Sequence, residues 1–365
     1  TGLNSHRFAK ISLKTKVDSD GNNWQTDVFL DTQIKSLAFN TVHGSFAKEK
    51  ELKGTFNVAY SAEKERIDVL TRGLKIGTDS FDITAFFNLA KGNALFAINI
   101  GTSILWQNAS NLLSGNISSK LDRFNRSQPI DVNCDIKGDF NAEGDPRIVV
   151  QAIIKDNELS IPDGLIKKCN FKGIFTNNFK PKDGYNDANS AIILTRFVGE
   201  YENIPLTIPQ AAINNFEKPM ATGLVNSDFD IQNLNEMSND KWIQFSEGHA
   251  KANLKFQFDI VDLYITKPHF IGNVKVDNAS FLYISKNVKA EKINVELDFT
   301  EKAFLIKKIA YKHKSNTIFI DGKINNFLNL YYDAPEKMIV DWNIYFPSLD
   351  LKQFLGILAT SQKKK

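Results

Sequence analysis

The sequence predicts a mainly-β protein whose strands form an elongated, curled antiparallel sheet accompanied by a few short helices. Apolar and polar residues alternate along many segments, most regularly in 293–299 and 340–346. Successive side chains of a strand face opposite sides, so this alternation builds a sheet with one apolar and one polar face. The chain has 365 residues, more than the roughly 250–300 at which a single compact core stops growing. We therefore expect it to divide into domains or to extend along one axis.

Strands are expected almost without interruption in the first part of the chain. Turns rich in Gly, Asn, Ser and charged residues separate them. The clearest strand patterns are 28–30, 34–39, 54–60, 66–70, 81–87 and 94–100. A short helix is expected at 107–113.

The middle of the chain continues the pattern. Further strands are expected at 132–140, 148–154, 165–176 and 191–198, and the polar stretch 177–189 is expected to be a loop. Residues 208–214 fit either a strand or a short helical turn, and 232–241 fit a helix.

Three local signals concern the last part of the chain. The pair Asp277 and Asn278 predicts a turn. The apolar phase moves by one residue between Ile260 and Val261, and such a slip predicts a β-bulge within a strand. Ser348, directly after Pro347, is placed to cap a short amphipathic helix over 348–358.

An internal similarity predicts two modules. Residues 81–85 resemble 318–322, and 103–113 resemble 348–358, so a set of strands followed by a Ser-initiated short helix occurs twice. We expect the C-terminal half of a first β module at 1–115 and a second β module at 116–365. The alternation begins close to Thr1, and no signal peptide or membrane-spanning apolar run is present. We therefore expect the chain to be a piece of a longer protein or a mature form.

The cysteines Cys134 and Cys169 are too few for a disulfide scaffold. Each shares the strand parity of apolar neighbours, where cysteine commonly behaves as a small hydrophobic residue. We expect both thiols to be buried, with no disulfide between them.

Composition and motifs argue against catalysis and nucleic-acid binding. The 45 basic and 42 acidic residues are interleaved and give a net charge of +3, which is not a nucleic-acid footprint. The five histidines are dispersed, and no CxxC, GxSxG, GxGxxG or Walker-type loop occurs. Residues 18–22 resemble a calcium loop, but Phe29 stands where the loop needs its acidic twelfth residue. We expect no catalytic residue, no metal site, no cofactor and no enzymatic activity.

The aromatic residues leave two interpretations open. There are 28 phenylalanines against 9 tyrosines and 4 tryptophans, and many of the phenylalanines occupy the apolar register of strands. They could form the dry core of stacked β-sandwich domains in a structural or adhesive protein. Alternatively, they could line a groove for acyl chains on a long sheet. Roughly 20 strands spaced at ~4.8 Å would extend ~95 Å, and open sheets rarely exceed about 10 strands without curling or splitting.

The residues expected to line such a groove are apolar and share one strand parity. They are Ile293, Val295, Leu297, Phe299, Val340, Trp342, Ile344, Phe346, Phe256 and Phe258. Asn294, Glu296 and Asp298 alternate with the first set and are expected on the opposite, polar face.

Several segments resemble a known family. Residues 272–283 (GNVKVDNASFLY), 293–297 (INVEL), 321–327 (DGKINNF) and 346–351 (FPSLDL) are similar to the C-terminal region of AsmA-like proteins. The abundance of Lys, Asn and Ile resembles members from Bacteroidetes-type bacteria. Most of the chain is compatible with this resemblance.

The resemblance implies a fold, a ligand and a location. It implies a β-taco groove akin to TamB and the bridge-like lipid-transfer proteins, with phospholipid as the partner. It also implies a periplasmic body in a Gram-negative bacterium, held to the inner membrane by an N-terminal segment absent here, and a role in lipid transport to the outer membrane. The family carries no catalytic residues to transfer to this sequence.

Overall fold

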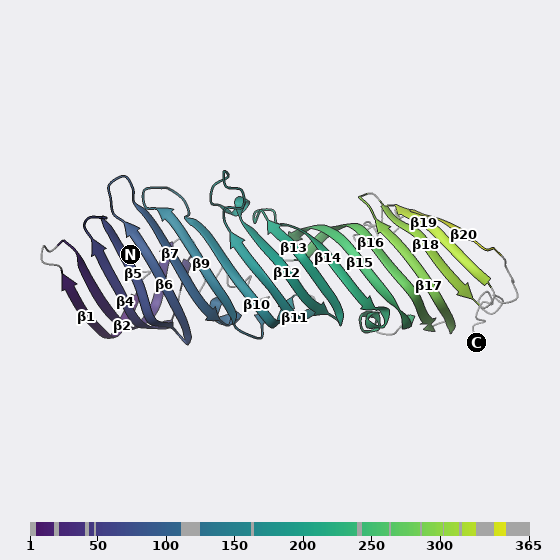
Figure 1. Ribbon diagram of the computed structural model, residues 1–365, viewed down its shortest axis with the longest axis horizontal. Helices are drawn as coiled ribbons and strands as arrows, with labels where there is room; N and C mark the ends of the chain where they lie inside the picture. Colours follow the sequence, from purple (N-terminus) through teal and green to yellow (C-terminus); the bar gives the residue numbers. More distant parts are fainter. Residues whose placement is uncertain are drawn as a thin grey trace, which may run out of the picture. The chain divides into compact units, whose positions relative to one another are not determined.

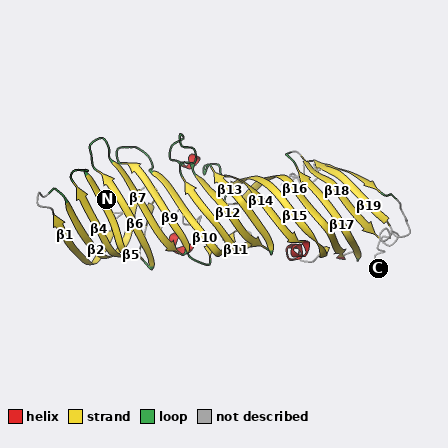
Figure 2. Ribbon diagram, viewed as in Figure 1, coloured by secondary structure: helices red, strands yellow, loops and turns green. Residues whose placement is uncertain are grey.

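The computed structural model describes residues 5–17, 22–40, 44–46, 49–110, 125–161, 164–238, 243–262, 264–284, 287–301, 303–313, 316–325 and 339–347. Strands make up 76% of it and form an antiparallel sheet that is not closed, and the described part has two short α-helices. Strands, in yellow, dominate the ribbon in Figure 2. The prediction of a mainly-β protein with few helices is confirmed.

The chain divides into two compact units. One consists of Thr1–Thr195 with Ala212–Lys218, and the other of Arg196–Ala211 with Pro219–Lys365. The predicted module boundary at 115 falls within residues 111–124, which lie outside the described part of the chain. The two-module arrangement therefore stays a prediction.

The first unit is a sequence of antiparallel strand pairs (Figure 1). Its strands are β1 (Ser5–Val17), β2 (Trp24–Asn40), β3 (Gly44–Phe46), β4 (Lys50–Ser61), β5 (Arg66–Ile76), β6 (Asp79–Asn88), β7 (Leu95–Ile104), β8 (Asn125–Arg126), β9 (Ile130–Asp139), β10 (Arg147–Ile161) and β11 (Gly164–Thr176). The pairing order is β1, β2, β4, β5, β6, β7, β9, β10, β11. The short β3 pairs with the end of β2, and β8 with the end of β10.

Two strands have residues in both units, namely β12 (Ala191–Tyr201) and β13 (Ile204–Asn214). The second unit continues with β14 (Met220–Asp230), β15 (Ile243–Val261), β16 (Tyr264–Tyr283), β17 (Val288–Phe299), β18 (Ala303–His313), β19 (Asn316–Asn325) and β20 (Ile339–Tyr345). From β14 onward each strand pairs antiparallel with the next one in sequence.

The helical elements are short. They are α1 (Trp106–Ser110), α3 (Leu234–Ser238) and two 3-10 turns, η1 (Asp187–Asn189) and η2 (Ile231–Asn233). The element α1 overlaps the expected helix at 107–113, and η2 and α3 overlap the expected helix at 232–241. The turn η1 lies within the expected loop at 177–189, while 208–214 belongs to β13. The predicted helix over 348–358 lies outside the described residues, as do residues 18–21 of the calcium-loop-like segment.

Two predictions about β15 and β16 were wrong: the predicted turn is a β-bulge, and the predicted β-bulge is a turn. Asp277 and Asn278 form no turn but lie inside β16, where the register shifts between Val276 and Ala279 and Asn278 takes a positive φ of 52°. This local geometry is a β-bulge, and the Asn278 N–H donates to Asn294 Oδ1 at 2.9 Å. The phase slip at Val261 is the opposite case. There β15 ends and the chain reverses through Asp262, whose φ is 51°.

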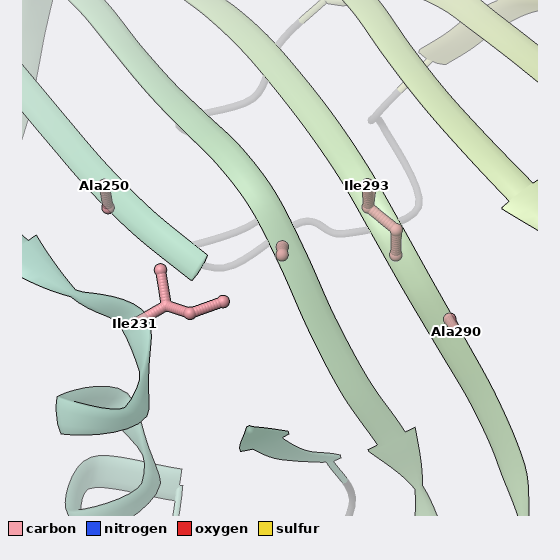
Figure 3. Close-up of a cluster of buried hydrophobic side chains, with 5 residues drawn as sticks. Ile231, Ala250, Ala290 and Ile293 are labelled. Carbon is pink, nitrogen blue, oxygen red and sulfur yellow. The ribbon is translucent and has the colours of Figure 1, made fainter. Parts of the chain in front are cut away.

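A small buried cluster anchors the apolar face of the second unit (Figure 3). Ile231, in the 3-10 turn that follows β14, is 2% exposed and packs against Ala250, Ala279, Ala290 and Ile293. Three of these strand residues are alanines, and their short side chains leave room for the isoleucine. The turn and the neighbouring Leu234 therefore cover one end of the apolar face of β15–β17.

Candidate functional site

The strand register shows which side chains of the second unit share a face. Residues directly opposite each other in an antiparallel pair point to the same side of the sheet. One row crosses the strands through Val225, Leu254, Gly272, Phe299, Phe304, Ile324 and Val340. The next row contains Ala252, Val274, Leu297, Ile306, Gly322 and Trp342. A third row contains Phe229, Ala250, Val276, Val295, Ile309, Ile320 and Ile344.

The predicted lining residues of β15, β17 and β20 therefore lie on a single face, which we call the apolar face. The register shifts in β15–β18 fall between or outside these rows, so the residues of each row remain directly paired. The alternation in the sequence assigned these strand residues to one face, and their partners on the neighbouring strands of that face are also apolar.

The lining residues differ in how deeply they are buried. Ile293 is 6% exposed and belongs to the Ile231 cluster, against which Val295 packs. Leu297 and Phe299 are half-buried, and the Phe299 ring lies 4.8 Å from that of Phe304. The rings of Phe256 and Phe258 stack 5.1 Å apart.

The lining residues of β20 are open to solvent. Val340, Ile344 and Trp342 are all exposed, the last by 60%. Gly322 of β19 lies close to the backbone of β20, where an added Cβ would meet the Asp341 carbonyl oxygen and the Cβ of Trp342. Phe346, just beyond β20, is half-buried. The apolar face thus changes from buried near β15–β17 to exposed at β20.

The first unit has an apolar face of the same kind, which the sequence-based list of lining residues omitted. One row runs through Leu13, Val28, Phe56 and Thr71, and another through Ile83, Ile100, Cys134, Val150 and Phe175. The Ile83 N–H donates to the Thr71 hydroxyl oxygen at 2.8 Å and so links the two rows. Phe140 adds a ring that lies 4.9 Å from Phe96 and 6.1 Å from Phe87. The alternation of these strands was visible in the sequence, and their parity could have been used to find the same face.

The opposite face of the second unit is polar and carries paired charges. Lys251 Nζ lies 3.0 Å from Asp228 Oδ2, and Lys307 Nζ lies 2.6 Å from Asp298 Oδ2. His249 sits between two carboxylates, with Nδ1 3.0 Å from Asp230 Oδ1 and Nε2 in contact with Asp228. Hydrogen bonds to Asp230 and then to Asp228 raise the pKa of His249 above its usual value.

Two open hollows lie on the polar side rather than on the apolar face. One of about 400 Å³ in the first unit is lined by Asn57, Arg66, Asp68, Thr84, Asn99 and Asp135, among others. Another of about 310 Å³ in the second unit is lined mainly by Asn226, Asp228, Lys251, Asn253 and Asn273. Their walls combine apolar residues, such as Leu70 and Phe86 in the first hollow, with polar side chains that pair with each other, such as Arg66 with Asp68 and Lys251 with Asp228. Both hollows are open, so neither resembles an enclosed ligand site.

The cysteines follow the prediction in part. Cys134 and Cys169 form no disulfide with each other. Cys169 is fully buried, and its thiol donates to the Ile166 carbonyl at 3.4 Å. Cys134 is only half-buried, because it lies on the apolar face of a single sheet layer rather than in an enclosed core. Burial, with a smaller contribution from Asp135, raises the pKa of the Cys134 thiol to about 11.

Within the described ranges, no group of His, Cys, Asp and Glu side chains has the arrangement of a metal site. The helices of the same ranges are too short or too polar to cross a membrane. No protein-family model, curated protein or solved structure matches the chain. The resemblance to AsmA-like proteins thus stays a hypothesis that rests on the sequence segments alone.

Proposed function

We propose that this protein shields the acyl chains of phospholipid on its apolar face, as a periplasmic lipid-transfer protein that serves the outer membrane of a Gram-negative bacterium. The observation that carries the proposal is the run of registered apolar rows from β14 to β20, in which most aromatic and aliphatic side chains are only half-buried or are exposed. Soluble proteins rarely leave a large contiguous apolar surface without a ligand or partner.

The chemistry of such a role needs no catalytic residue. Burying each methylene of an acyl chain contributes about 0.8 kcal/mol, so a polar gap several carbons long would raise a barrier of several kcal/mol. Neighbouring strands are about 4.8 Å apart, and each row supplies an apolar residue or a glycine at nearly every step. A chain lying along a row therefore meets no charged side chain.

Stacked β-sandwich domains in an adhesive or structural protein are the alternative. In a sandwich, a second sheet covers the apolar face and the core is dry. The described strands instead belong to one sheet, and Trp342 on the apolar face is 60% exposed. Both observations favour a face that receives a ligand.

Co-purified lipid tests the proposal. We expect organic extraction of the native protein, followed by mass spectrometry, to recover phospholipid at a fixed ratio to protein. Trp342→Asp, on the apolar face, should lower that ratio. Asn343→Lys introduces a charge on the polar face of the same strand, where Asn343 already donates to Asp321 Oδ2 at 3.0 Å, and should leave the ratio unchanged. Protein that is folded and free of lipid, or lipid carried equally by both variants, would count against the proposal.

A further inference from the structure

Strand β20 forms an edge that lacks the protection usual for sheet edges. It pairs with β19 along its whole length without a bulge, and with no other strand of the described ranges. All 7 of its residues are exposed, and Asp341 is its single charged residue. Natural edge strands usually carry lysines, a proline or a bulge, because an open row of N–H and C=O groups is a template for pairing.

Strand β1 is the corresponding edge of the first unit, and its charged residues are basic, whereas the one charged residue of β20 is acidic. It pairs with β2, and its described side chains, at positions 10–17, are all exposed. Lys10, Lys14 and Lys16 point to the polar side, while Ile11, Leu13 and Val17 point to the apolar side. No acidic residue occurs between Ser5 and Val17. Two β1 strands would therefore repel each other, since like charges directly opposite are destabilising.

We propose that β20 of one molecule pairs antiparallel with β1 of a second molecule, with Trp342 opposite Leu13. This register places Ile344 opposite Ile11 on the apolar face. On the polar face the same register places Asp341 opposite Lys14, so the single charge of β20 meets an opposite charge. Opposite-charge and aromatic–aliphatic pairs of this kind stabilise antiparallel strands.

The register is specified by the alternation of both strands. A slip of one residue would move Lys14 to a position opposite Trp342 and would turn the apolar side chains of β1 to the polar face. A slip of two residues keeps the faces. In one direction it puts Asp341 opposite Ser12, and in the other it puts Asp341 opposite Lys16 but leaves Ile339 beyond the end of β1.

The contact is head to tail, because two different edges meet. Such contacts propagate, and they form open chains when the rotation between copies does not close a ring. The pairing would also continue the apolar rows of one molecule onto the next. This inference goes beyond lipid binding and does not depend on it, since strand pairing requires only the two edges.

Charge reversal tests the pairing with the full chain. We expect sedimentation velocity to show concentration-dependent association of the wild type. Asp341→Lys and Lys14→Asp should each weaken that association about tenfold or more, because an attractive pair becomes a repulsive one. The double variant should restore it. An equimolar mixture of the two single variants should also associate, as chains in which the two variants alternate, since β20 of each variant carries the charge opposite to that of β1 in the other.

Two further measurements check that the variants are folded and whether something other than β1 covers the β20 edge. Both positions are exposed, so thermal melts of all variants should match the wild type. A wild type that stays monomeric at every concentration overturns the proposal. If β20 amides in that monomer are protected from hydrogen exchange, the chain's own residues cover the edge. Association that ignores Lys14→Asp also overturns it and points to pairing of β20 with β20 or to contact through the apolar face.

Discussion

Ile293→Asp is expected to unfold the second unit or to destabilise it by about 3–5 kcal/mol, the range for a buried charge without a partner. Ile293 is 6% exposed in the Ile231 cluster, and no cation is among the residues that form that cluster. Chemical denaturation followed by tryptophan fluorescence measures the loss.

Trp342→Asp is the matched control on the same face. Because Trp342 is 60% exposed, the introduced carboxylate stays hydrated, and the free energy of unfolding should change by less than about 1 kcal/mol. Equal destabilisation by the two substitutions would show that β20 is packed in a closed core, as a sandwich requires. No destabilisation by Ile293→Asp would contradict the buried cluster.

Gly272→Ala is expected to destabilise the protein by about 3 kcal/mol or more, through backbone strain and overlap together. Gly272 has a φ of +144°, and an added Cβ would overlap the Asn253 carbonyl oxygen on the neighbouring strand. The glycine lies in the row between Leu254 and Phe299, where β15 and β16 approach closely. Equilibrium unfolding in urea measures the effect.

Gly101→Ala provides the comparison for a strand glycine without these constraints. Its added Cβ would lie 3.9 Å from the nearest atom, an ordinary contact, and alanine is better suited than glycine to a strand interior. We expect this variant to be as stable as the wild type or slightly more stable. A similar loss of stability in both variants would mean that the close approach of β15 and β16 at Gly272 does not cause the destabilisation.

The face of each strand residue could be predicted from the sequence, and the ends of some strands could not. Alternation over 293–299 is sufficient to assign parity, because a strand with one apolar face tolerates no slip. The Asp277–Asn278 pair and the phase slip between Ile260 and Val261 gave the wrong local structures for one reason. A left-handed residue serves a bulge and a tight turn equally well, and only the pairing partner decides between them. Asn278 is held inside β16 by Asn294, a residue 16 positions away.

The depth of burial along the apolar face also required the structure. Ile293 and Trp342 look alike in the alternating pattern, yet one lies beneath Ile231 and the other lies at a sheet edge. The covering residue comes from the 3-10 turn after β14, in a polar stretch whose sequence gives no sign of where it packs. The same holds for Cys134, whose apolar neighbours predicted full burial although a single sheet layer leaves it half-covered.

Site-specific photo-crosslinking along β17 tests the proposed lipid face most directly. Val295, Leu297 and Phe299 lie on the apolar face, and Asn294, Glu296 and Asp298 alternate with them on the polar face. Adjacent residues occupy nearly the same position along β17 and point to opposite faces of the sheet. Each residue is therefore a control for the next. We expect a photo-reactive residue at the first set to capture phospholipid in cells and the same residue at the second set to capture none. Capture that ignores parity, or no lipid adduct at any of the apolar positions in folded protein, would contradict a lipid-binding apolar face.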